Sequence, residues 1–125
     1  MNQYLDLDKP QFKAFVDLPV NQAFQMLNLL KFKNQVEEDG LTGEAQYQQY
    51  MMAAQPFIQK ANAKVVFYGK PVLNLIGPKE LEWNKVLIVE YTTKTDFIQM
   101  ITAPGYPAEL RKKALADSRL IVCTT

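Results

Sequence analysis

Two segments carry apolar residues on both faces of a predicted strand, and this pattern limits the fold more than any other feature of the sequence. One face of residues 24–33 carries Phe24, Met26, Asn28, Leu30 and Phe32, and the other carries Leu27 and Leu29. Residues 85–91 repeat the pattern, with Val86 and Ile88 on one face and Leu87 and Val89 on the other. A strand that is apolar on both faces is a central strand covered on both sides. The sequence therefore predicts a sheet whose two central strands need cover on each face.

Capping residues and apolar spacing predict two helices in the first half of the chain. Asp8 is a suitable cap for a short helix that Pro19 ends. Thr42 is a suitable cap for a longer helix, whose apolar residues follow three-four spacing over residues 47–61. Pro56 lies inside that pattern and predicts a kink or a break, because proline removes one backbone donor and clashes with the preceding turn.

The second half of the chain alternates strands with a further helical region. Residues 64–76 predict a long strand that Gly69 and Pro71 interrupt, so it is expected at an edge of the sheet or with a bulge. Thr93 begins a capping pattern for the next helix, which breaks near residues 104–107 and resumes for a turn or two. Residues 120–122 predict the last strand, which Arg119 opens.

The resulting order is strand, helix, strand, strand, helix, strand, and this order is typical of the ferredoxin-like α+β fold with an antiparallel four-stranded sheet. The expected organisation is one domain over residues 1–125, with a helical N-terminal extension (1–20) and a βαββαβ core (21–125). Its helices cover only one face of the sheet. A second copy of the chain would cover the other face, so we predict a homodimer.

Composition excludes several classes of function. The 125 residues contain no histidine, which removes Ser-His-Asp and Cys-His nucleophile pairs, ordinary zinc sites and His-ligated haem. The net charge of +1 argues against nucleic acid as a partner. The one cysteine, Cys123, allows no internal disulfide, and no apolar run is long enough for a membrane span. We expect a cytoplasmic protein with no cofactor, no metal and no membrane partner.

Several segments of the sequence resemble one known family. Met26-Leu27-Asn28-Leu29-Leu30-Lys31-Phe32 is similar to the signature strand of the family called Domain of Unknown Function 1330. Further similarities follow in order along the chain: residues 12–18, Gly43-Glu44-Ala45 with Tyr50, Ile76-Gly77-Pro78, Trp83, residues 86–89, Pro104 with Tyr106, and Asp117-Ser118-Arg119-Leu120. The resemblance implies the dimeric α+β barrel superfamily, in which two ferredoxin-like sheets close face to face. That superfamily includes cofactor-independent monooxygenases, isomerases and proteins without known activity, so the resemblance implies no particular reaction.

Asn28 is the strongest candidate for a functional residue, because it interrupts an otherwise apolar strand face. A buried amide must find hydrogen-bond partners or cost about 1–3 kcal/mol. Asn28 would either hold a ligand or water in a cavity, or be a core amide satisfied by backbone or by the partner chain. Met26, Leu30 and Phe32 on the same face would form the apolar lining of such a cavity.

Four more residues each have a functional and a structural interpretation. Glu90 could act as a general base if it were enclosed, or it could lie in water near its strand end. Tyr68 could hydrogen-bond a substrate oxygen, or it could pack half-buried with its hydroxyl at the rim. Arg119 could bind a ligand carboxylate, or form a salt bridge with Asp117 or Glu90. Trp83 could close a ligand pocket, or simply pack over one end of the sheet.

Two hypotheses of function follow from these residues. In the first, the chain is a small-molecule-binding barrel, either without catalysis or as a cofactor-independent enzyme of monooxygenase or isomerase type, with Asn28, Tyr68, Glu90 and Arg119 in one cavity. That grouping requires Asn28 and Glu90 to share a sheet face. In the second, the chain is a non-catalytic interaction protein whose apolar sheet face is only the dimer core. The cations at residues 111–113 are interpreted as a solvated helix face in both hypotheses.

Overall fold

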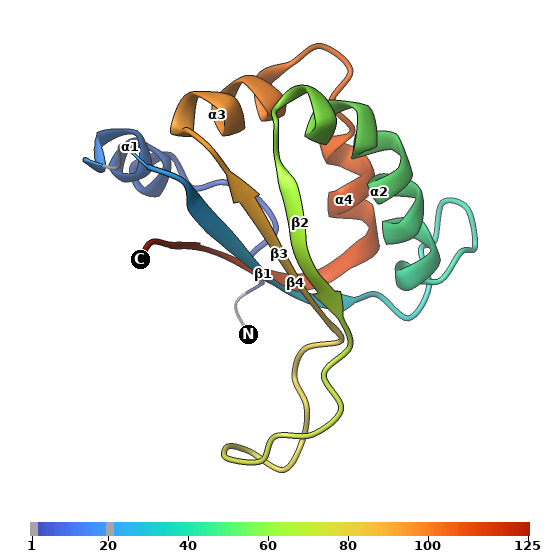
Figure 1. Cartoon of the computed structure of the whole chain (residues 1–125). Helices are drawn as coiled ribbons and strands as arrows, with labels where there is room; N and C mark the ends of the chain where they lie inside the picture. Colours follow the sequence, from blue (N-terminus) through green and yellow to red (C-terminus); the bar gives the residue numbers. More distant parts are fainter. Residues whose placement is uncertain (1–2, 20–21) are drawn as a thin grey trace.

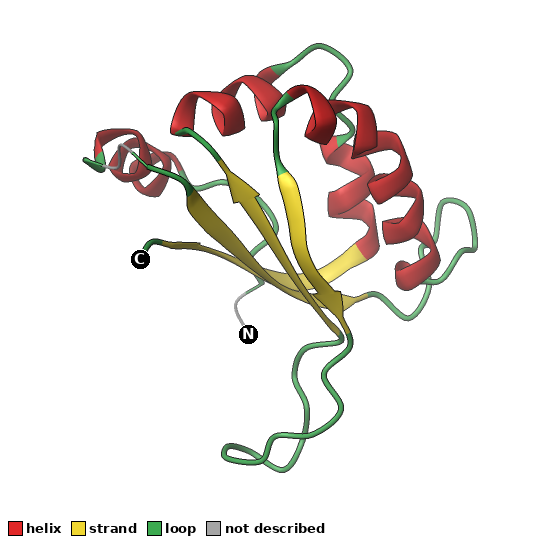
Figure 2. Cartoon of the chain, viewed as in Figure 1, coloured by secondary structure: helices red, strands yellow, loops and turns green. Residues whose placement is uncertain are grey.

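The computed structural model describes residues 3–19 and 22–125, so the predicted boundary between residues 20 and 21 lies outside the described residues. The elements follow in the order α1 (Lys9–Asp17), β1 (Phe24–Phe32), α2 (Gly43–Lys60), β2 (Lys64–Gly69), β3 (Lys85–Tyr91), α3 (Lys94–Thr102), α4 (Ala108–Ala114) and β4 (Leu115–Cys123) (Figure 1). The chain folds into an open sheet with α2, α3 and α4 on one side of it (Figure 2).

The four strands form one antiparallel sheet in the order β2-β3-β1-β4. This arrangement confirms the predicted ferredoxin-like α+β fold. The strands with apolar residues on both faces, β1 and β3, occupy the centre as predicted, and β2 is an edge strand. Its register shifts between Val65 and Phe67, a different place from the predicted interruption at Gly69 and Pro71.

Register decides which side chains share a face of the sheet, because residues opposite one another across a ladder point the same way. Asn28 lies opposite Leu87 of β3 and Leu120 of β4. We call the face that carries them, and that the helices cover, the helix face. Leu27 lies opposite Ile88 and Ile121 on the other side, which we call the open face.

Two apolar clusters fix the helices on the helix face. In the first, the Phe15 ring of α1 packs edge-on against Phe24 and Phe97, with ring centroids 5.8 Å and 5.6 Å away. In the second, Leu30 of β1 is fully buried with Tyr47. These contacts confirm that α1 lays an aromatic side chain on the main body. They also place α1 next to α3 on the helix face, because Phe15 contacts both Phe24 of β1 and Phe97 of α3.

The helices begin at the predicted residues. The side chains of Asp8, Thr42 and Thr93 accept hydrogen bonds from backbone amides three residues later, at 3.1, 3.1 and 3.0 Å. Gly43 opens α2 at a close approach of backbones, since a Cβ there would lie 2.4 Å from the carbonyl oxygen of Lys33. Helix α2 continues through Pro56 to its last turn, so the predicted break is wrong.

Two predicted strand limits are also wrong. Strand β2 ends at Gly69 instead of continuing to residue 76, because the chain leaves the sheet ahead of Pro71, which has no amide to donate to a ladder. Residues 70–84 instead form a long irregular projection, which we call the arm (Figure 1). Strand β4 begins at Leu115, five residues before its predicted start, so Arg119 lies in mid-strand.

Candidate functional site

An open cavity lies on the helix face of the sheet, between the N-terminal segment with α1 and the helices α3 and α4. Its walls come from segments far apart in the sequence, and they include Phe12, Met26, Asn28, Tyr47, Tyr50, Leu87, Tyr91, Phe97, Met100, Tyr106, Arg111 and Leu120. Most of these side chains are apolar or aromatic. The polar groups among them are an amide, a guanidinium and several phenols. The lining also includes charged side chains, among them the exposed carboxylates of Asp6, Asp8 and Glu109 and the paired Lys112. The arrangement of these groups decides what the cavity can hold.

Asn28 projects from the middle of β1 toward this cavity and is 6% exposed. Its amide nitrogen donates to the carbonyl oxygen of Leu87 at 3.3 Å, and its side-chain oxygen accepts from the guanidinium of Arg111 at 3.2 Å. The backbone of β3 therefore fixes the amide so that its oxygen points toward α4. This hydrogen bond positions the guanidinium of Arg111 in the cavity wall.

Arg111 is the one half-buried cation in the described cavity wall that lacks a carboxylate partner. Its neighbours on α4 are both paired, Lys112 with Asp6 at 3.1 Å and Lys113 with Asp39 at 3.7 Å. The ion pairs found among residues 3–19 and 22–125 do not include Arg111, whose hydrogen bond there goes to Asn28. A guanidinium carries five N–H donors. Most of its donors therefore remain available, and its charge is not neutralised by the protein.

Four tyrosines surround this charge. The hydroxyls of Tyr50 and Tyr106 hydrogen-bond one another, while the buried hydroxyl of Tyr47 has no partner at ordinary hydrogen-bond geometry. Burial raises the pKa of Tyr47, Tyr50, Tyr91 and Tyr106, and the nearby positive charge of Arg111 opposes that rise in each. All four therefore stay protonated at neutral pH and can act only as neutral hydrogen-bonding groups.

Gly105 brings Tyr106 to this position. Its φ of +84° allows the chain to turn between α3 and α4, a conformation that other residues adopt only with strain. The turn sets the Tyr106 ring edge-on against Phe57, with centroids 5.7 Å apart, and edge-on against Tyr50 at 6.2 Å. The aromatic wall of the cavity thus depends on a backbone feature of the loop as well as on helix packing.

The structure brings only some of the predicted site residues together. Met26 lines the cavity beside Asn28 as expected. Leu30 does not, because it is fully buried under α2 and α4, and Phe32 packs its ring 5.6 Å from that of Tyr47. Tyr68 shares the helix face, but it lies at the β2 edge under Lys85, outside the cavity wall. Burial raises its pKa, and Glu44 adds to the rise.

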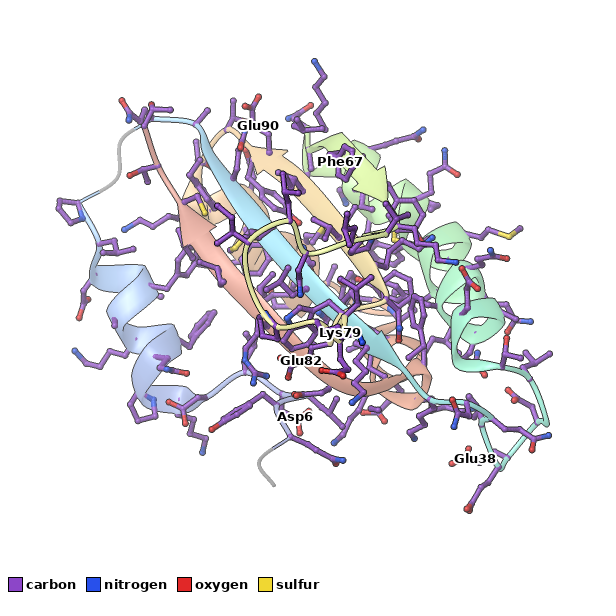
Figure 3. All side chains as sticks on the ribbon, turned by 90° about the horizontal axis from the view of Figure 1, so that it is seen from below. Asp6, Glu38, Phe67, Lys79, Glu82 and Glu90 are labelled. Atoms are coloured by element: carbon purple, nitrogen blue, oxygen red, sulfur yellow. The ribbon has the colours of Figure 1, made fainter. Side chains whose placement is uncertain are left out.

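The four-residue grouping of the first hypothesis is wrong, because Asn28 and Glu90 lie on opposite faces of the sheet. Glu90 is opposite Gln25 in the register, on the open face near the end of β3, and accepts a hydrogen bond from the Gln25 amide at 3.5 Å (Figure 3). Arg119 is opposite Leu29 on the same open face. A change of one residue along a strand reverses the face. Glu90 is therefore no base for a reaction near Asn28.

Arg119 has the structural role that its alternative interpretation predicted. Its guanidinium donates to the Asp117 carboxylate at 2.8 Å and lies between the rings of Tyr4 and Trp83, 4.7 and 5.1 Å from their centroids. Although its side chain also borders the cavity where that cavity passes the β4 edge, its charge is already neutralised. The Trp83 ring contacts the Arg119 guanidinium and is not among the residues that line the cavity.

The chain is similar over its whole length to RPA0582, a protein of unknown function from Rhodopseudomonas palustris. One solved structure, of the methylated protein, is 32% identical, with 100% of this chain and 96% of that chain aligned and a TM-score of 0.92. A second is 31% identical, with 99% and 98% aligned and a TM-score of 0.90. The chain belongs to the RPA0582 family.

More distant structures share only the fold with this member of the RPA0582 family. A dimeric ferredoxin-like protein of unknown function from Bacteroides fragilis is 16% identical, with 82% of this chain and 96% of that chain aligned and a TM-score of 0.53. SnoaB, a cofactor-independent oxygenase from Streptomyces nogalater, is 16% identical, with 83% and 93% aligned and a TM-score of 0.51. No protein-family model and no curated protein matches the chain, so the resemblance to Domain of Unknown Function 1330 is not confirmed.

Arg111 is the site residue that the sequence analysis of this RPA0582 relative missed. The interpretation of residues 111–113 as a solvated face is wrong for Arg111 alone. A signal was present, because Arg111 lies three positions before Ala114, the fully buried last residue of α4. That spacing puts a residue on the buried side of a helix. The run of three cations hid the signal.

Two classes of site are not found in the part of the chain that the structure describes. No cluster of three or more acidic, cysteine or histidine side chains there has the arrangement of a metal site. No helix among those residues is long and apolar enough to cross a membrane.

Proposed function

We propose that this RPA0582 family member binds a small organic anion with an apolar or aromatic body in the cavity on the helix face. Arg111 would neutralise the anionic group, Asn28 would hold Arg111 in place, and the buried hydroxyl of Tyr47 would supply or accept a further hydrogen bond. The observation that carries the proposal is a half-buried guanidinium with no carboxylate partner, aimed at an apolar cavity. A charge in such a place is costly unless a counter-ion meets it.

The chemistry of the walls narrows the ligand class. A guanidinium binds carboxylates through two parallel hydrogen bonds, which favours a carboxylate as the anionic group. Phe12, Phe97 and Met100 supply apolar surface for the rest of the molecule. The tyrosines stay protonated and Glu90 is on the other face, so none of these groups can act as a general base in the cavity. The arrangement therefore favours binding an anionic ligand over removing a proton from a substrate. If a reaction occurs here, Arg111 stabilises an anion that the substrate itself develops.

A thermal-shift and calorimetric comparison of benzoate with its neutral isostere benzamide tests this proposal. Benzoate should raise the melting temperature of wild type and benzamide should not. Arg111→Met should weaken benzoate binding about tenfold or more, which corresponds to the loss of one charge-assisted contact. Lys113→Met, which removes a neighbouring cation that has a carboxylate partner and does not line the cavity, is the matched control and should bind as wild type does.

Two results would contradict the proposal. One is equal stabilisation of wild type by benzoate and benzamide, which would mean that the charge is not recognised. The other is unchanged benzoate binding by Arg111→Met. Asn28→Ala serves as a second variant. Arg111→Lys keeps the positive charge but removes the two parallel donors of the guanidinium, so it tests the two contributions separately. Both should fall between wild type and Arg111→Met.

We also propose that the protein is a cytoplasmic homodimer that associates through the open face of the sheet. The open face is not covered by any helix of the described chain, and Phe67 and Ile121 on it are 52% and 42% exposed. The ferredoxin-like proteins of Bacteroides fragilis and Thermobifida fusca are described as dimeric, which supports the same assembly here. Sedimentation equilibrium tests it, and a monomer at all accessible concentrations would contradict it.

A further inference from the structure

The arm carries an unusual concentration of exposed apolar side chains. Val72, Leu73, Leu75 and Ile76 are 81%, 70%, 89% and 96% exposed. Isolated apolar residues on a surface are ordinary, but four highly exposed ones within five positions are more than a single chain usually leaves uncovered, which suggests that another surface covers them. The values also show that these side chains do not pack on the sheet of their own chain.

The arm has a defined shape despite its lack of regular structure. The side-chain amide of Asn74 donates to the carbonyl oxygens of Pro78 at 2.9 Å and Glu80 at 3.4 Å, which ties the outgoing limb to the returning one. The returning limb is fixed to the sheet, because Asn84 donates its backbone amide to the Leu30 carbonyl at 2.7 Å and accepts from the Phe32 amide at 2.8 Å. A segment held in this way offers its apolar side chains to a partner at reduced entropic cost.

The arm projects on the open side of the sheet. In Figure 1 it extends below the sheet, whereas α2, α3 and α4 lie above it. In the view from below, the arm with Lys79 and Glu82 lies in front of the sheet (Figure 3). The arm and the open face therefore lie on the same side of the molecule. A partner chain packed on the open face would also be within reach of the arm.

We propose that the arm of each protomer packs its apolar limb on the open face of a second copy of the chain. The proposal rests on the homodimer proposed above and adds the contact that closes it. A two-fold axis makes the contact occur twice, with each arm on the partner's sheet. A stable interface needs about 800 Å² from each partner, and the arm adds apolar surface to the exposed side chains of the sheet.

Charge favours a second copy over a membrane as the occupant. The arm carries exposed Glu80 and Glu82 together with exposed Lys70 and Lys79, so it has no net positive charge that would attract it to an anionic lipid surface. The open face carries exposed Lys31 and Lys64, and neither is within ion-pair distance of a carboxylate in the described chain. Acidic groups on the arm thus have cationic partners available on the face that the arm would cover.

The first experiment measures the dimer dissociation constant by sedimentation equilibrium. The double substitution Leu75→Glu with Ile76→Glu should raise it about a hundredfold or more, since two buried charges would oppose the contact. Lys79→Glu, also on the arm but polar in wild type, is the matched control and should stay within about threefold. Both changes are on exposed side chains, so circular dichroism should show an unchanged fold.

A third variant, Ile121→Glu on the open face, separates this inference from the homodimer on which it depends. If Ile121→Glu weakens the dimer and the arm variant does not, the dimer stands and the role of the arm is wrong. If wild type itself is monomeric, both proposals fail. If both variants weaken the dimer, both are supported.

Photo-crosslinking then decides whether the arm reaches the partner. A protein with p-benzoylphenylalanine in place of Ile76 is mixed with isotope-labelled wild type and irradiated. Crosslinks from the arm to labelled strand peptides containing residues 25–29 or 119–123 are expected. Crosslinks confined to the chain that carries the probe, or the absence of a crosslink to either strand, would overturn the inference.

Discussion

The two faces of the sheet differ in how their charged side chains are neutralised. On the open face, the Arg119 guanidinium pairs with the Asp117 carboxylate and contacts the rings of Tyr4 and Trp83. The carboxylate also accepts hydrogen bonds from the backbone amides of Tyr4 and Ser118. On the helix face, Arg111 hydrogen-bonds the amide oxygen of Asn28 and lies near Tyr47, and no carboxylate in the described part of the chain pairs with it. The first cation has a structural role. For the second we propose a ligand as the counter-ion.

The apolar side chains of the two faces also differ in how well the chain itself covers them. The helix face buries its leucines and aromatic rings under the chain's own helices, while the open face and the arm leave theirs exposed. One face of the sheet thus carries a cation without a carboxylate partner, and the other carries exposed apolar side chains. We propose that a small anion neutralises the first and that another copy of the chain covers the second.

The largest expected effect is an alkaline loss of stability that originates on the helix face. Burial raises the pKa of Tyr47, Tyr50 and Tyr91 well above the usual value near 10. Their neutral forms are favoured in the fold, so their contribution is complete below about pH 10 and is lost as the pH rises above it. At about pH 11 each should cost about 1 kcal/mol, so the three together should cost about 3–4 kcal/mol.

Phenolate absorbance and denaturant unfolding measured over the same pH range check this expectation. The buried tyrosines should ionise together with unfolding. A titration in which every tyrosine ionises near its ordinary pKa, with no loss of stability, would show that the helix face is open to water.

Substitution of neighbouring leucines distinguishes the two faces through the concentration dependence of stability. Leu30→Ala removes a fully buried side chain from the helix face and should cost about 3 kcal/mol at every protein concentration. Leu29→Ala, one residue away on the open face, should cost less, and its effect should grow with dilution because the dimer is weakened. Urea unfolding at several concentrations measures both. Equal, concentration-independent losses would remove the distinction between the faces.

Two phenol-to-phenyl substitutions test the unpartnered hydroxyl on the helix face. Tyr47→Phe removes a buried hydroxyl without a partner and should leave the free protein as stable or about 1 kcal/mol more stable. Tyr50→Phe breaks the hydrogen bond with Tyr106 and should cost about 1 kcal/mol. Thermal unfolding compares the pair. A larger loss from Tyr47→Phe than from Tyr50→Phe would contradict the assigned roles.

The smallest expected effect belongs to the neutralised pair on the open face. Desolvation alone would raise the pKa of Asp117, but hydrogen bonds from the Tyr4 amide, Arg119 and the Ser118 amide together lower it. Its contribution is therefore present above about pH 4 and lost as the pH falls through the lowered pKa. Asp117→Asn should cost about 1 kcal/mol or less at neutral pH. A cost that persists in acid would exclude the carboxylate charge as its cause.

Much of the fold was predictable because it depends on short-range patterns. The caps at Asp8, Thr42 and Thr93 and the alternation around Asn28 are properties of a few consecutive residues, and each is present in the structure. The arm was not predictable by the same reasoning. Its apolar residues favour a strand, but apolar side chains also suit a projection that packs on another molecule. Local sequence does not distinguish the two.

The candidate site was predicted in part, for the same physical reason. The sequence by itself determined that Asn28 shares a strand face with Met26 and Leu30, because side chains alternate with a period of two on any strand. Only the tertiary structure decided that α4 covers that face and that Glu90 and Arg119 lie on the opposite face of the sheet. The Asn28–Arg111 hydrogen bond joins residues 83 positions apart. Such a contact follows from how a helix docks on a sheet, which no local pattern of either segment encodes.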